Sequence, residues 1–338
     1  MRTLVTGGTG FLGGNLVQHL LSHGAPVRVL TRSMTKARPL VAQGVEMIEG
    51  EVTDRRALTK AMQGVEVVYH LAGRLFVQGI PVEEYYRTHV EGTRSLLECC
   101  DKGSLKRLVH CSTTGVLGVT GNQPADEETQ PAPTNVYEAT KWEAEQLVRA
   151  AIECGLPAAI VRPGLVYGPG DLHLLGFFQS IRRGLFRPIG ERPVWLHPVY
   201  VSDLAEALWR CAQDPHAIGE CFHIAGREPV TMATLAATIA TSLGVDPPHG
   251  TIPMPAARAL AAAGDMLPAG LKRLAPLTSS RLEFLTNSRV YDVHKAQQLL
   301  GFVAQTDLSA GIARTVDWYR YQRYLPGASR LASLEKVA

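Results

Sequence analysis

The sequence predicts an α/β fold in which helices cover both faces of a doubly wound parallel sheet, followed by a smaller mixed α/β lobe. Three observations carry this prediction. A glycine-rich turn joins the first apolar run to a helical pattern at the start of the chain. Strand-like and helix-like segments then alternate through the first half, as they do in parallel sheets. Near Tyr167 the alternation ends, and helices mixed with Pro-rich segments follow.

The glycine-rich turn lies within residues 1–13. Residues 4–5 are typical of a strand, a G-x-x-G-x-x-G pattern follows, and residues 15–24 indicate a helix. A second strand at 26–30 completes a βαβ unit. Such glycines let a pyrophosphate approach the backbone, where a helix N-terminus offers free N–H groups. The unit therefore predicts a dinucleotide-binding domain of the Rossmann type. The cofactor would lie against the turn residues Gly7, Thr9, Gly10, Phe11, Leu12 and Gly13.

The other elements follow in order along the chain. Strands are expected over residues 45–49, 65–72, 105–112 and 158–162, and helices over 55–62, 81–100 and 135–154. A short helix at 177–184 then precedes a return to the sheet, with a strand at 197–201, a helix capped by Ser202 or Asp203, and a strand at 220–224. We therefore assign residues 1–168, with 196–226 returning to them, to the cofactor-binding domain. The substrate-binding lobe is assigned to residues 169–195 and 227–330, and a tail to 331–338.

The composition argues against several classes of function. A net charge of +3, without a basic run that has interleaved aromatic residues, gives no support for a nucleic-acid partner. The eleven histidines and six cysteines contain no H-E-x-x-H and no C-x-x-C spacing, so we expect no metal site. Cysteines without such pairs are typical of free thiols in a reducing compartment, which predicts a cytoplasmic protein.

No signal peptide and no integral membrane segment is expected. The first strand begins at residue 3, which leaves no room for a signal sequence before it. The most apolar later stretch, residues 252–277, is interrupted by charged residues and prolines and is therefore unsuited to span a bilayer. Buried helices over a pocket are expected there, and a peripheral membrane contact is the alternative.

The end of the second strand sets the choice between the two nicotinamide cofactors. NAD enzymes of this fold carry an acidic residue there, which holds the ribose 2′-hydroxyl, whereas an Arg accommodates the 2′-phosphate of NADP. Thr31 and Arg32 occupy this place, with Lys36 nearby. A guanidinium can bind a phosphate bidentately. We therefore expect NADP(H) to be preferred, with NAD(H) as the alternative if Arg32 is only a solvated surface residue.

Tyr137 and Lys141 form a Y-x-x-x-K pattern at the start of a predicted helix. Asn135 is an N-cap signal, and Glu138 follows three residues later as in a capping box. The spacing places Tyr137 and Lys141 on one face of the helix. A free phenol has a pKa of about 10, and a fixed ammonium beside it lowers that pKa toward the range useful for proton transfer. The pair is therefore a candidate general acid/base and its electrostatic partner.

Further motifs occur in one order around these two. They are Val68-Tyr-His-Leu-Ala-Gly73, Val90-Glu-Gly-Thr93, Cys111-Ser-Thr-Thr-Gly115, Arg162-Pro-Gly-Leu-Val-Tyr-Gly168 and His197-Pro-Val-Tyr-Val-Ser-Asp203. Together with the glycine turn and the Y-x-x-x-K pair, they resemble the extended short-chain dehydrogenase/reductase family, the NAD-dependent epimerase/dehydratase group. The resemblance covers nearly the whole chain.

The resemblance implies a role for each matching position. Tyr137 would be the general acid/base and Lys141 its partner, which also holds the nicotinamide ribose; Thr113, with Ser112 beside it, would be the hydroxyl partner. The remaining cofactor contacts would come from Glu51, Val52, Leu71, Ala72, Gly73, Pro163, Gly164 and Val166. His89 stands where the family usually has an Asn that supports the active-site hydrogen bonds. The resemblance also implies a homodimer formed through the helices near residues 84–101 and 137–153.

Two branches of the family compete for the reaction. Leu165 replaces the Asn that serves the substrate diphosphate in nucleotide-sugar enzymes, and Thr31 replaces their acid. Both changes resemble the 3β-hydroxysteroid dehydrogenase and dihydroflavonol reductase branch, which acts on apolar carbonyl compounds. Candidate pocket residues are also apolar, although they could instead be core: Leu75, Phe76, Val116, Leu117, Phe177 and Trp195.

The predicted function is therefore a reversible hydride transfer between the nicotinamide of NAD(P)(H) and the carbonyl or alcohol of a largely apolar small molecule. The arginines at 182, 183, 187 and 192 support a nucleotide-sugar epimerase or dehydratase with bound NAD as the alternative, unless they form a solvated face. A second alternative is a non-enzymatic NADP-sensing protein on the same fold.

Overall fold

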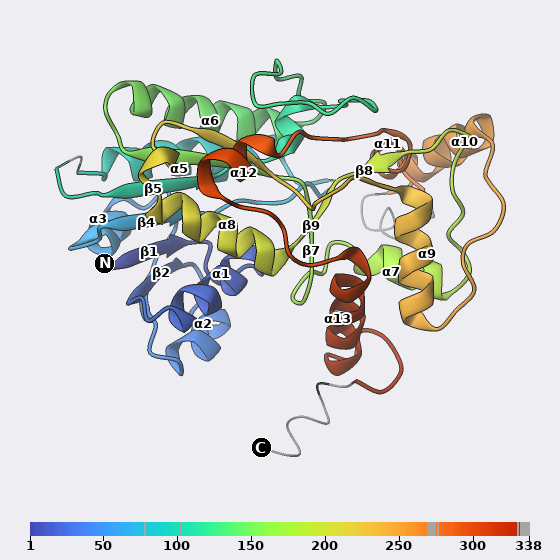
Figure 1. Ribbon diagram of the computed structural model, residues 1–338, viewed down its shortest axis with the longest axis horizontal. Coiled ribbons are helices and arrows are strands. Elements are labelled where there is room, and N and C mark those ends of the chain that lie inside the picture. The colour runs from blue at the N-terminus through green and yellow to red at the C-terminus, as the bar shows by residue number, and fades with distance from the viewer. Residues whose placement is uncertain (78, 102, 269–274, 276, 330, 332–338) are drawn as a thin grey trace.

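The computed structural model describes residues 1–77, 79–101, 103–268, 275, 277–329 and 331. A seven-stranded sheet forms its centre, in the order β10-β6-β5-β4-β1-β2-β3, and every neighbouring pair in it is parallel (Figure 1). This order is that of a doubly wound Rossmann sheet with one more strand at the β6 edge, as the alternating pattern predicts. The strands are β1 (Thr3–Thr6), β2 (Val27–Thr31), β3 (Glu46–Glu49), β4 (Val67–His70), β5 (Arg107–Cys111), β6 (Ala158–Pro163) and β10 (Cys221–Ile224).

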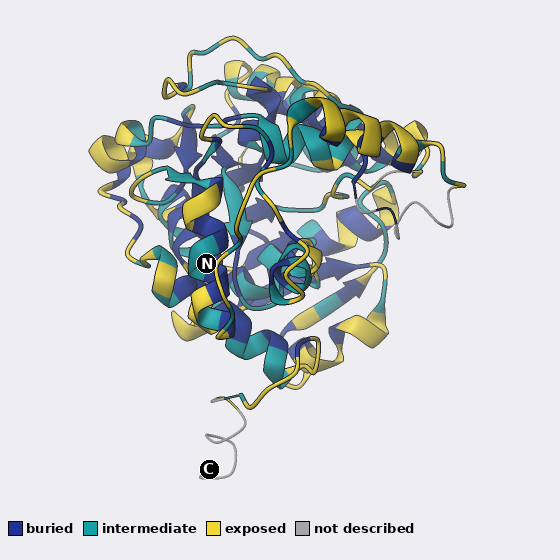
Figure 2. Cartoon of the chain, turned by 90° about the vertical axis from the view of Figure 1, so that its right-hand side faces the viewer, coloured by how far each residue is buried: buried dark blue, intermediate teal, exposed yellow. Residues whose placement is uncertain are grey.

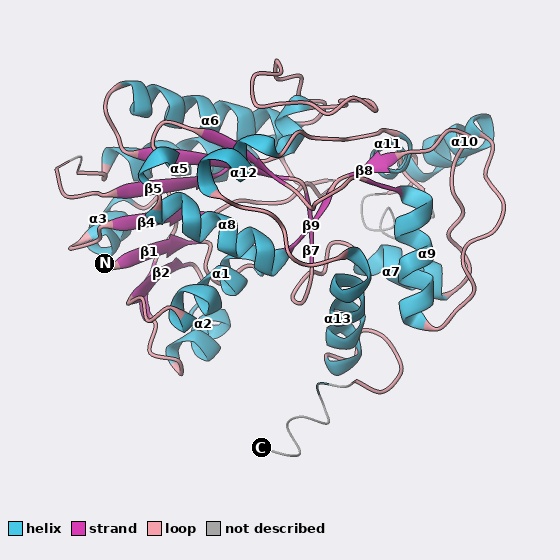
Figure 3. Ribbon diagram, in the orientation of Figure 1, coloured by secondary structure: helices cyan, strands magenta, loops and turns pink. Residues whose placement is uncertain are grey.

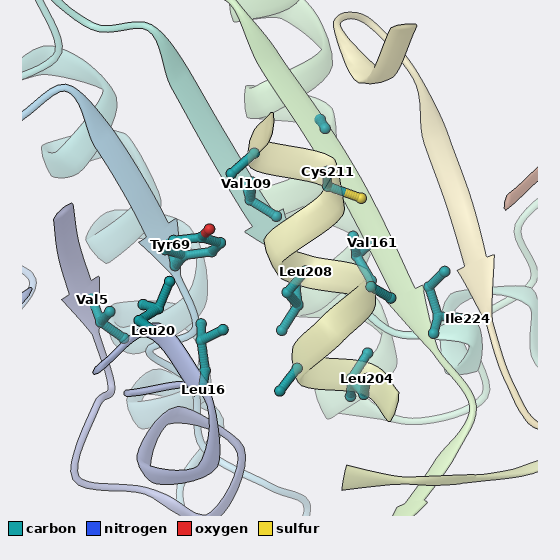
Figure 4. Close-up of a cluster of buried hydrophobic side chains, with 14 of the residues drawn as sticks. Val5, Leu16, Leu20, Tyr69, Val109, Val161, Leu204, Leu208, Cys211 and Ile224 are labelled. Atoms are coloured by element: carbon teal, nitrogen blue, oxygen red, sulfur yellow. The ribbon is translucent and has the colours of Figure 1, made fainter. Parts of the chain in front are cut away.

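Helices cover both faces of the sheet because its strands are apolar on both sides. Along β1, Val5 points into the core formed with α1 (Phe11–Ser22) and α8 (Val201–Gln213), part of which Figure 4 shows. Its neighbour Leu4 points into the opposite core. The helices on that second face are α3 (Arg55–Met62), α5 (Gly92–Glu98) and α6 (Val136–Glu153). Helix α2 (Met34–Val41), which the sequence analysis did not predict, follows β2 and contacts β3.

The predicted helix over residues 81–100 contains a wider turn in its middle. It consists of α4 (Val82–Tyr86), the π-helical turn η1 (Arg87–Glu91) and α5. A π-turn inserts one residue into the helical repeat and changes the direction of the side chains that follow it. Here it lies where His89 and Val90 are buried beside the sheet.

The chain after β6 returns to the large sheet later than predicted. The strand expected at 197–201 is β9 (Pro198–Tyr200), which pairs with β7 (Leu165–Tyr167) in a separate small sheet. The free edge of β6 is occupied by β10 instead, so β9 has no place there. Helix α8 begins at Val201 directly after β9, and Tyr200 rather than Ser202 or Asp203 is its N-cap.

The smaller C-terminal region packs around its own apolar core. It is built from α7 (Leu175–Arg182), β8 (Trp195–Leu196), β11 (Val230–Thr231), α9 (Met232–Leu243), α10 (Met254–Asp265), α11 (Ser279–Thr286) and α13 (Leu308–Tyr321). Strands β8 and β11 pair antiparallel. Figure 3 shows this mostly helical region beside the parallel sheet, and Figure 2 shows buried residues concentrated inside and exposed residues on the outer faces of the helices.

One segment of the predicted substrate lobe lies elsewhere. Helix α12 (His294–Leu300) contacts β10 and α8, and Ala296 and Leu300 belong to the core of the large sheet. The 3₁₀ turns η2 (Thr114–Leu117) and η3 (Pro215–Ala217) complete the described elements. Among the described residues, no helix combines the length and the apolar composition needed to cross a bilayer. Part of the stretch 252–277, and residues 332–338 of the predicted tail, lie outside the described residues.

Candidate active site

The glycine turn brings a helix N-terminus close to the end of β1. Helix α1 begins at Phe11 with Gly10 as its N-cap, four residues before the predicted start, because the turn itself supplies the first helical residues. A Cβ atom on Gly13 would collide with the carbonyl group of Gly7, so only glycine fits. The first N–H groups of the helix have no partner within it. A pyrophosphate fits such a cradle, because the backbone is open to it and the helix dipole favours its charge.

The segment after β4 packs against the same glycine turn. Gly7 has a φ of 75°, and a Cβ atom there would lie 2.9 Å from the backbone of Leu71 and of Ala72. The Ala72 N–H donates to Thr6 Oγ1 over 3.2 Å. The predicted cofactor residues Gly7, Leu71 and Ala72 are therefore in contact. Of the other turn residues, Leu12 packs against the core and Phe11 lies beside Gly170.

The end of β2 carries hydroxyl and basic groups near the turn. Thr31 is buried, and its Oγ1 accepts from the Ser33 N–H over 3.2 Å and lies 3.3 Å from Thr9 Oγ1. Ser33 also caps α2, and the side chains of Arg32 and Lys36 are exposed. The cap was not predicted, although a Ser before a helical segment is a known signal. Two cations therefore lie at the place where an acid would hold an unphosphorylated ribose.

Glu51 and Val52 follow β3, and each contacts the broken helix. The Glu51 carboxylate forms an ion pair with Arg87 of η1. Val52 lies against Gly92, at which a Cβ atom would be 2.6 Å from Val52 Cγ2. The carboxylate proposed to contact adenine is therefore shared with a cation of the same chain.

Helix α6 carries Tyr137 and Lys141, the predicted catalytic pair, in its first two turns. Asn135 caps the helix by accepting from the Glu138 N–H over 3.1 Å, as predicted. The Glu138 carboxylate accepts from the N–H of Thr134 over 2.7 Å, one residue before the position that a capping box would use. Tyr137 is hydrogen-bonded to the side chain of Thr113. Lys141 is buried, and its Nζ donates to the carbonyl oxygen of Cys111 over 2.6 Å.

The pKa of Tyr137 moves in the direction opposite to the one expected. Burial raises it above the ordinary phenol value, Cys111 and Glu138 raise it further, and the hydrogen bond with Thr113 lowers it. Burial also lowers the pKa of Lys141. The expectation that the ammonium group lowers the phenol pKa is not met in this structure, because burial is the larger effect and the ammonium group is held against the Cys111 carbonyl.

The two predicted hydroxyl partners point into different surroundings. Ser112 Oγ donates to Glu145 over 2.7 Å, and Glu145 is fully buried between Arg162 and Arg149. Burial raises the pKa of Glu145, but its hydrogen bonds with Arg162 hold it below the ordinary value. Ser112 therefore belongs to a buried ion cluster that the sequence analysis missed, and Thr113 is the hydroxyl that meets Tyr137.

His89 connects the segment after β4 with helix α6. Its Nε2 accepts from the Arg74 N–H over 3.0 Å, and Nδ1 lies 2.8 Å from Thr140 Oγ1. Burial lowers the pKa of His89 to about 3, so the ring is neutral and Nδ1 carries the proton that Thr140 accepts. The ring stands nearly perpendicular to that of Tyr137, with 5.6 Å between centroids. The residue that departs from the family pattern thus supports helix α6 directly.

The end of β6 completes the predicted cofactor contacts. Thr114 Oγ1 donates to the carbonyl oxygen of Pro163 over 3.0 Å, and the Gly164 N–H donates to Ile224. Val166 lies in β7 opposite Val199. These residues lie at and just after the carboxyl end of β6. The bond from Thr114 joins them to η2, which begins directly after Thr113.

Some candidate pocket residues are core instead. Val116 and Leu117 are buried together with Ala125 and Tyr291, and Phe177 packs edge-on against Phe186. In contrast, Leu75 is exposed, Phe76 stacks on Tyr85, and Trp195 is partly buried in β8.

A glycine-turn Rossmann domain with a tyrosine, a lysine and a threonine gathered near the carboxyl ends of its strands defines an NAD(P)-dependent oxidoreductase. The chain belongs to the NAD-dependent epimerase/dehydratase family, whose model matches residues 3–225. With this family assignment, the enzyme class is that of the extended short-chain dehydrogenases/reductases.

Known proteins similar to the whole chain support this assignment. A putative dihydroflavonol 4-reductase of Synechocystis sp. is 29% identical, over 95% of each chain. A 4-hydroxy-2-methyl-3-oxo-4-farnesyl-3,4-dihydroquinoline-1-oxide ketoreductase of Stigmatella aurantiaca is 30% identical, over 92% of this chain and 95% of its own.

Solved structures agree with the fold. The crystal structure of gox2253 superposes with a TM-score of 0.80 at 26% identity, over 96% of this chain and 99% of that chain. MoeE5 in complex with UDP-glucose and NAD gives a TM-score of 0.75 at 26% identity, over 96% and 100%. The non-enzymatic alternative gains no support from these similarities.

Proposed function

We propose that this protein reduces, in a reversible reaction, the carbonyl group of a largely apolar small molecule with NADPH. The observation that carries the proposal is the hydrogen-bonded pair of Tyr137 and Thr113 beside buried Lys141, next to a glycine turn that fits a dinucleotide. The names of the similar ketoreductase and dihydroflavonol reductase support a ketone as the reacting group.

The chain's own residues would act on the oxygen atom of the substrate. The nicotinamide, when bound, supplies a hydride to the carbonyl carbon. The Tyr137 hydroxyl gives its proton to the carbonyl oxygen, and Thr113 donates a hydrogen bond to the same oxygen. Lys141, fixed by the Cys111 carbonyl, places a cation one helical turn from the phenol as the proton leaves. In the reverse direction, the phenolate takes the proton back from the alcohol.

The preference for NADPH is part of the proposal. Thr31 takes the place of an acid, and the exposed Arg32 and Lys36 can reach a 2′-phosphate without a carboxylate at that position to repel it. The phosphate cradle would consist of Gly7, Thr9, Gly10, Phe11, Leu12 and Gly13. Further contacts are proposed for Glu51, Val52, Leu71, Ala72, Gly73, Pro163, Gly164 and Val166.

A homodimer and a two-part chain complete the proposal. Helix α4 carries the exposed side chains of Val82 and Tyr86, and the Tyr86 hydroxyl donates to Glu143 of α6. These helices would pair with those of a second copy, which light scattering on the purified protein would detect as a doubled mass.

We retain the division into residues 1–168 with 196–226 and a substrate lobe, apart from α12. The free cysteines fit a cytoplasmic protein.

A cofactor titration combined with a substrate panel tests the proposed function. NADPH and NADH binding is followed by fluorescence, and turnover is assayed on steroid-like ketones, aromatic aldehydes and β-keto esters. Tighter binding of NADPH with turnover on one of these classes is expected. Retained NAD, an inactive panel and activity on a UDP-sugar would contradict the proposal in favour of an epimerase.

A further inference from the structure

A buried ion pair joins the catalytic helix to the C-terminal region. Glu138 follows Tyr137 in α6, and its side chain is only 4% exposed. Its Oε1 accepts from Arg289 Nη1 over 2.8 Å, and its Oε2 accepts from the N–H of Thr134 over 2.7 Å and lies 2.8 Å from the Thr134 hydroxyl. Both carboxylate oxygens of Glu138 therefore have partners, and one of them comes from a residue 151 positions away in the sequence.

Arg289 is itself held by the C-terminal region. It lies between α11 and α12, on the segment that crosses back toward the large sheet in Figure 1. Its N–H donates to the carbonyl of Trp195 in β8 over 2.8 Å. Glu283 of α11 lies 3.5 Å from Arg289 Nη2 and 2.7 Å from the Thr134 hydroxyl, whose single proton is donated to either Glu283 or Glu138. The start of α6 is thus bound to α11 and to β8 through one connected network.

The same side chain of Glu138 also packs against the loop that carries Thr113. A Cβ atom on Gly115 would lie 3.1 Å from Glu138 Cγ. The Gly115 N–H in turn donates to Thr113 Oγ1 over 3.0 Å. Glu138 is therefore adjacent in sequence to Tyr137 and in space to the residue that orients Thr113.

The charges around Arg289 indicate that it pairs with carboxylates of this chain. Two carboxylates, Glu138 and Glu283, face the single guanidinium of Arg289. The charge of the Arg289 guanidinium is therefore already paired and is not available to bind an acidic substrate group. A buried carboxylate is tolerated only when it is paired, so loss of Arg289 would leave Glu138 uncompensated at the first turn of α6.

We propose that Arg289 is a positioning residue, which through Glu138 fixes the first turn of α6 and so couples the placement of the C-terminal region to the geometry of the Tyr137–Thr113 pair. The coupling itself follows from the contacts above. Its effect on turnover rests on the proposed function.

A pH profile distinguishes this coupling from simple structural support. The groups that act on the Tyr137 hydroxyl are Cys111 at the end of β5, Thr113 after it, and Glu138 of α6. The His89 ring lies beside the Tyr137 ring, and Lys141 is one helical turn along α6. Among them Glu138 is the carboxylate, and its charge is offset by Arg289. Loss of Arg289 should move the acidic limb of the profile for alcohol oxidation to higher pH, and loss of the Glu138 charge should move it to lower pH.

The experiment compares Arg289→Met, Arg289→Lys, Glu138→Gln and the double variant E138Q/R289M. Arg227→Met is the control, because the Arg227 guanidinium, which follows β10, binds the carbonyl of Ala304 and the side chain of Gln305, and both of these partners lie outside α6. Hydrogen exchange of residues 134–141 is measured in the protein without cofactor. Turnover, KM and the pH profile are measured with NADP⁺ and the alcohol product of the panel compound that the wild type reduces fastest.

Arg289→Met is expected to speed exchange over residues 134–141 by about tenfold, as loss of a charge-assisted hydrogen bond would. It should lower kcat by about ten- to a hundredfold, since small displacements of catalytic groups cost that much, while the affinity for the cofactor stays unchanged. Arg289→Lys should recover part of the rate. The acidic limb of the pH profile should shift by about one pH unit to higher pH in Arg289→Met and to lower pH in Glu138→Gln. In the double variant it should lie at its wild-type position.

Unchanged exchange over 134–141 in Arg289→Met, or equal effects of Arg227→Met, would overturn the proposal. If Arg289→Met does not fold, the same comparison is made with Glu138→Gln, for which wild-type exchange over residues 134–141 and an unmoved pH profile together overturn it. Faster exchange in a protein whose wild type reduces none of the panel compounds would refute the proposed function and support the coupling.

Discussion

At the scale of single residues, the candidate site depends on groups that do not themselves react. Thr113 is hydrogen-bonded to Tyr137, His89 donates to Thr140 of α6, and the Cys111 carbonyl accepts from Lys141. Spacing and family resemblance predicted Tyr137, Lys141 and Thr113 as candidate site residues. They could not identify Arg289, because a contact across 151 residues leaves no local pattern.

Arg32 allows a direct test of cofactor choice. Arg32→Ser removes the charge proposed to bind the 2′-phosphate, and a hydrogen bond to a charged group contributes about 1.5–3 kcal/mol. The Kd for NADPH should therefore rise about ten- to a hundredfold, while the Kd for NADH changes little. Arg38→Ser, on the exposed side of α2 farther from the turn, should leave both unchanged. Equal losses for NADPH and NADH in Arg32→Ser would mean that Arg32 does not select the cofactor.

At the scale of elements, patterns of apolar residues predicted every strand of the large sheet, because most of these strands are buried on both faces and leave continuous apolar runs. The edge strand β3 has two glutamates and is largely not buried. Helix α2 escaped prediction since it is short and contains Pro39. The π-turn η1 has no local signal of its own, and the pairing of β9 with β7 depends on which strand occupies the edge of β6.

The strand–turn–helix element makes a prediction with a built-in control. Gly13→Ala places a methyl group against the Gly7 carbonyl, which forces the turn apart. NADPH binding should weaken by more than about tenfold, since overpacking costs roughly 1–3 kcal/mol. In Gly14→Ala the new methyl group lies 3.7 Å from its nearest neighbour and should leave binding intact. Isothermal calorimetry on both variants decides the matter, and a Gly13→Ala variant that binds normally would exclude this cradle.

At the scale of the whole molecule, buried histidines tie stability to pH. Burial lowers the pKa of His70, His89 and His223 to about 3 and that of His110 well below its ordinary value. The unfolded chain protonates its histidines near pH 6.5, whereas the folded chain does not until far lower pH. The unfolded state therefore binds more protons below pH 6.5, and stability falls as the pH decreases from there toward 3.

His110 is the cleanest place to measure this effect. Neither of its ring nitrogens has a hydrogen-bond partner within the described part of the chain. His110→Phe should therefore gain stability relative to the wild type as the pH falls from 6.5 to 4.5, by up to about 1.4 kcal/mol per pH unit. Urea unfolding at several pH values measures it. His249→Gln, at an exposed site, should follow the wild type. A His110→Phe curve parallel to that of the wild type would show that His110 is protonated in the folded protein.

The transfer of deuterium to a ketone of the panel from NADPH that carries deuterium at both C4 positions tests the central claim most directly. For the wild type, we predict one deuterium atom in the released alcohol for each cofactor oxidised, detected by mass spectrometry. Tyr137→Phe should bind NADPH normally and transfer about 10²- to 10⁴-fold more slowly, since it lacks the proton donor. A Tyr137→Phe variant that transfers deuterium at the wild-type rate would contradict the account.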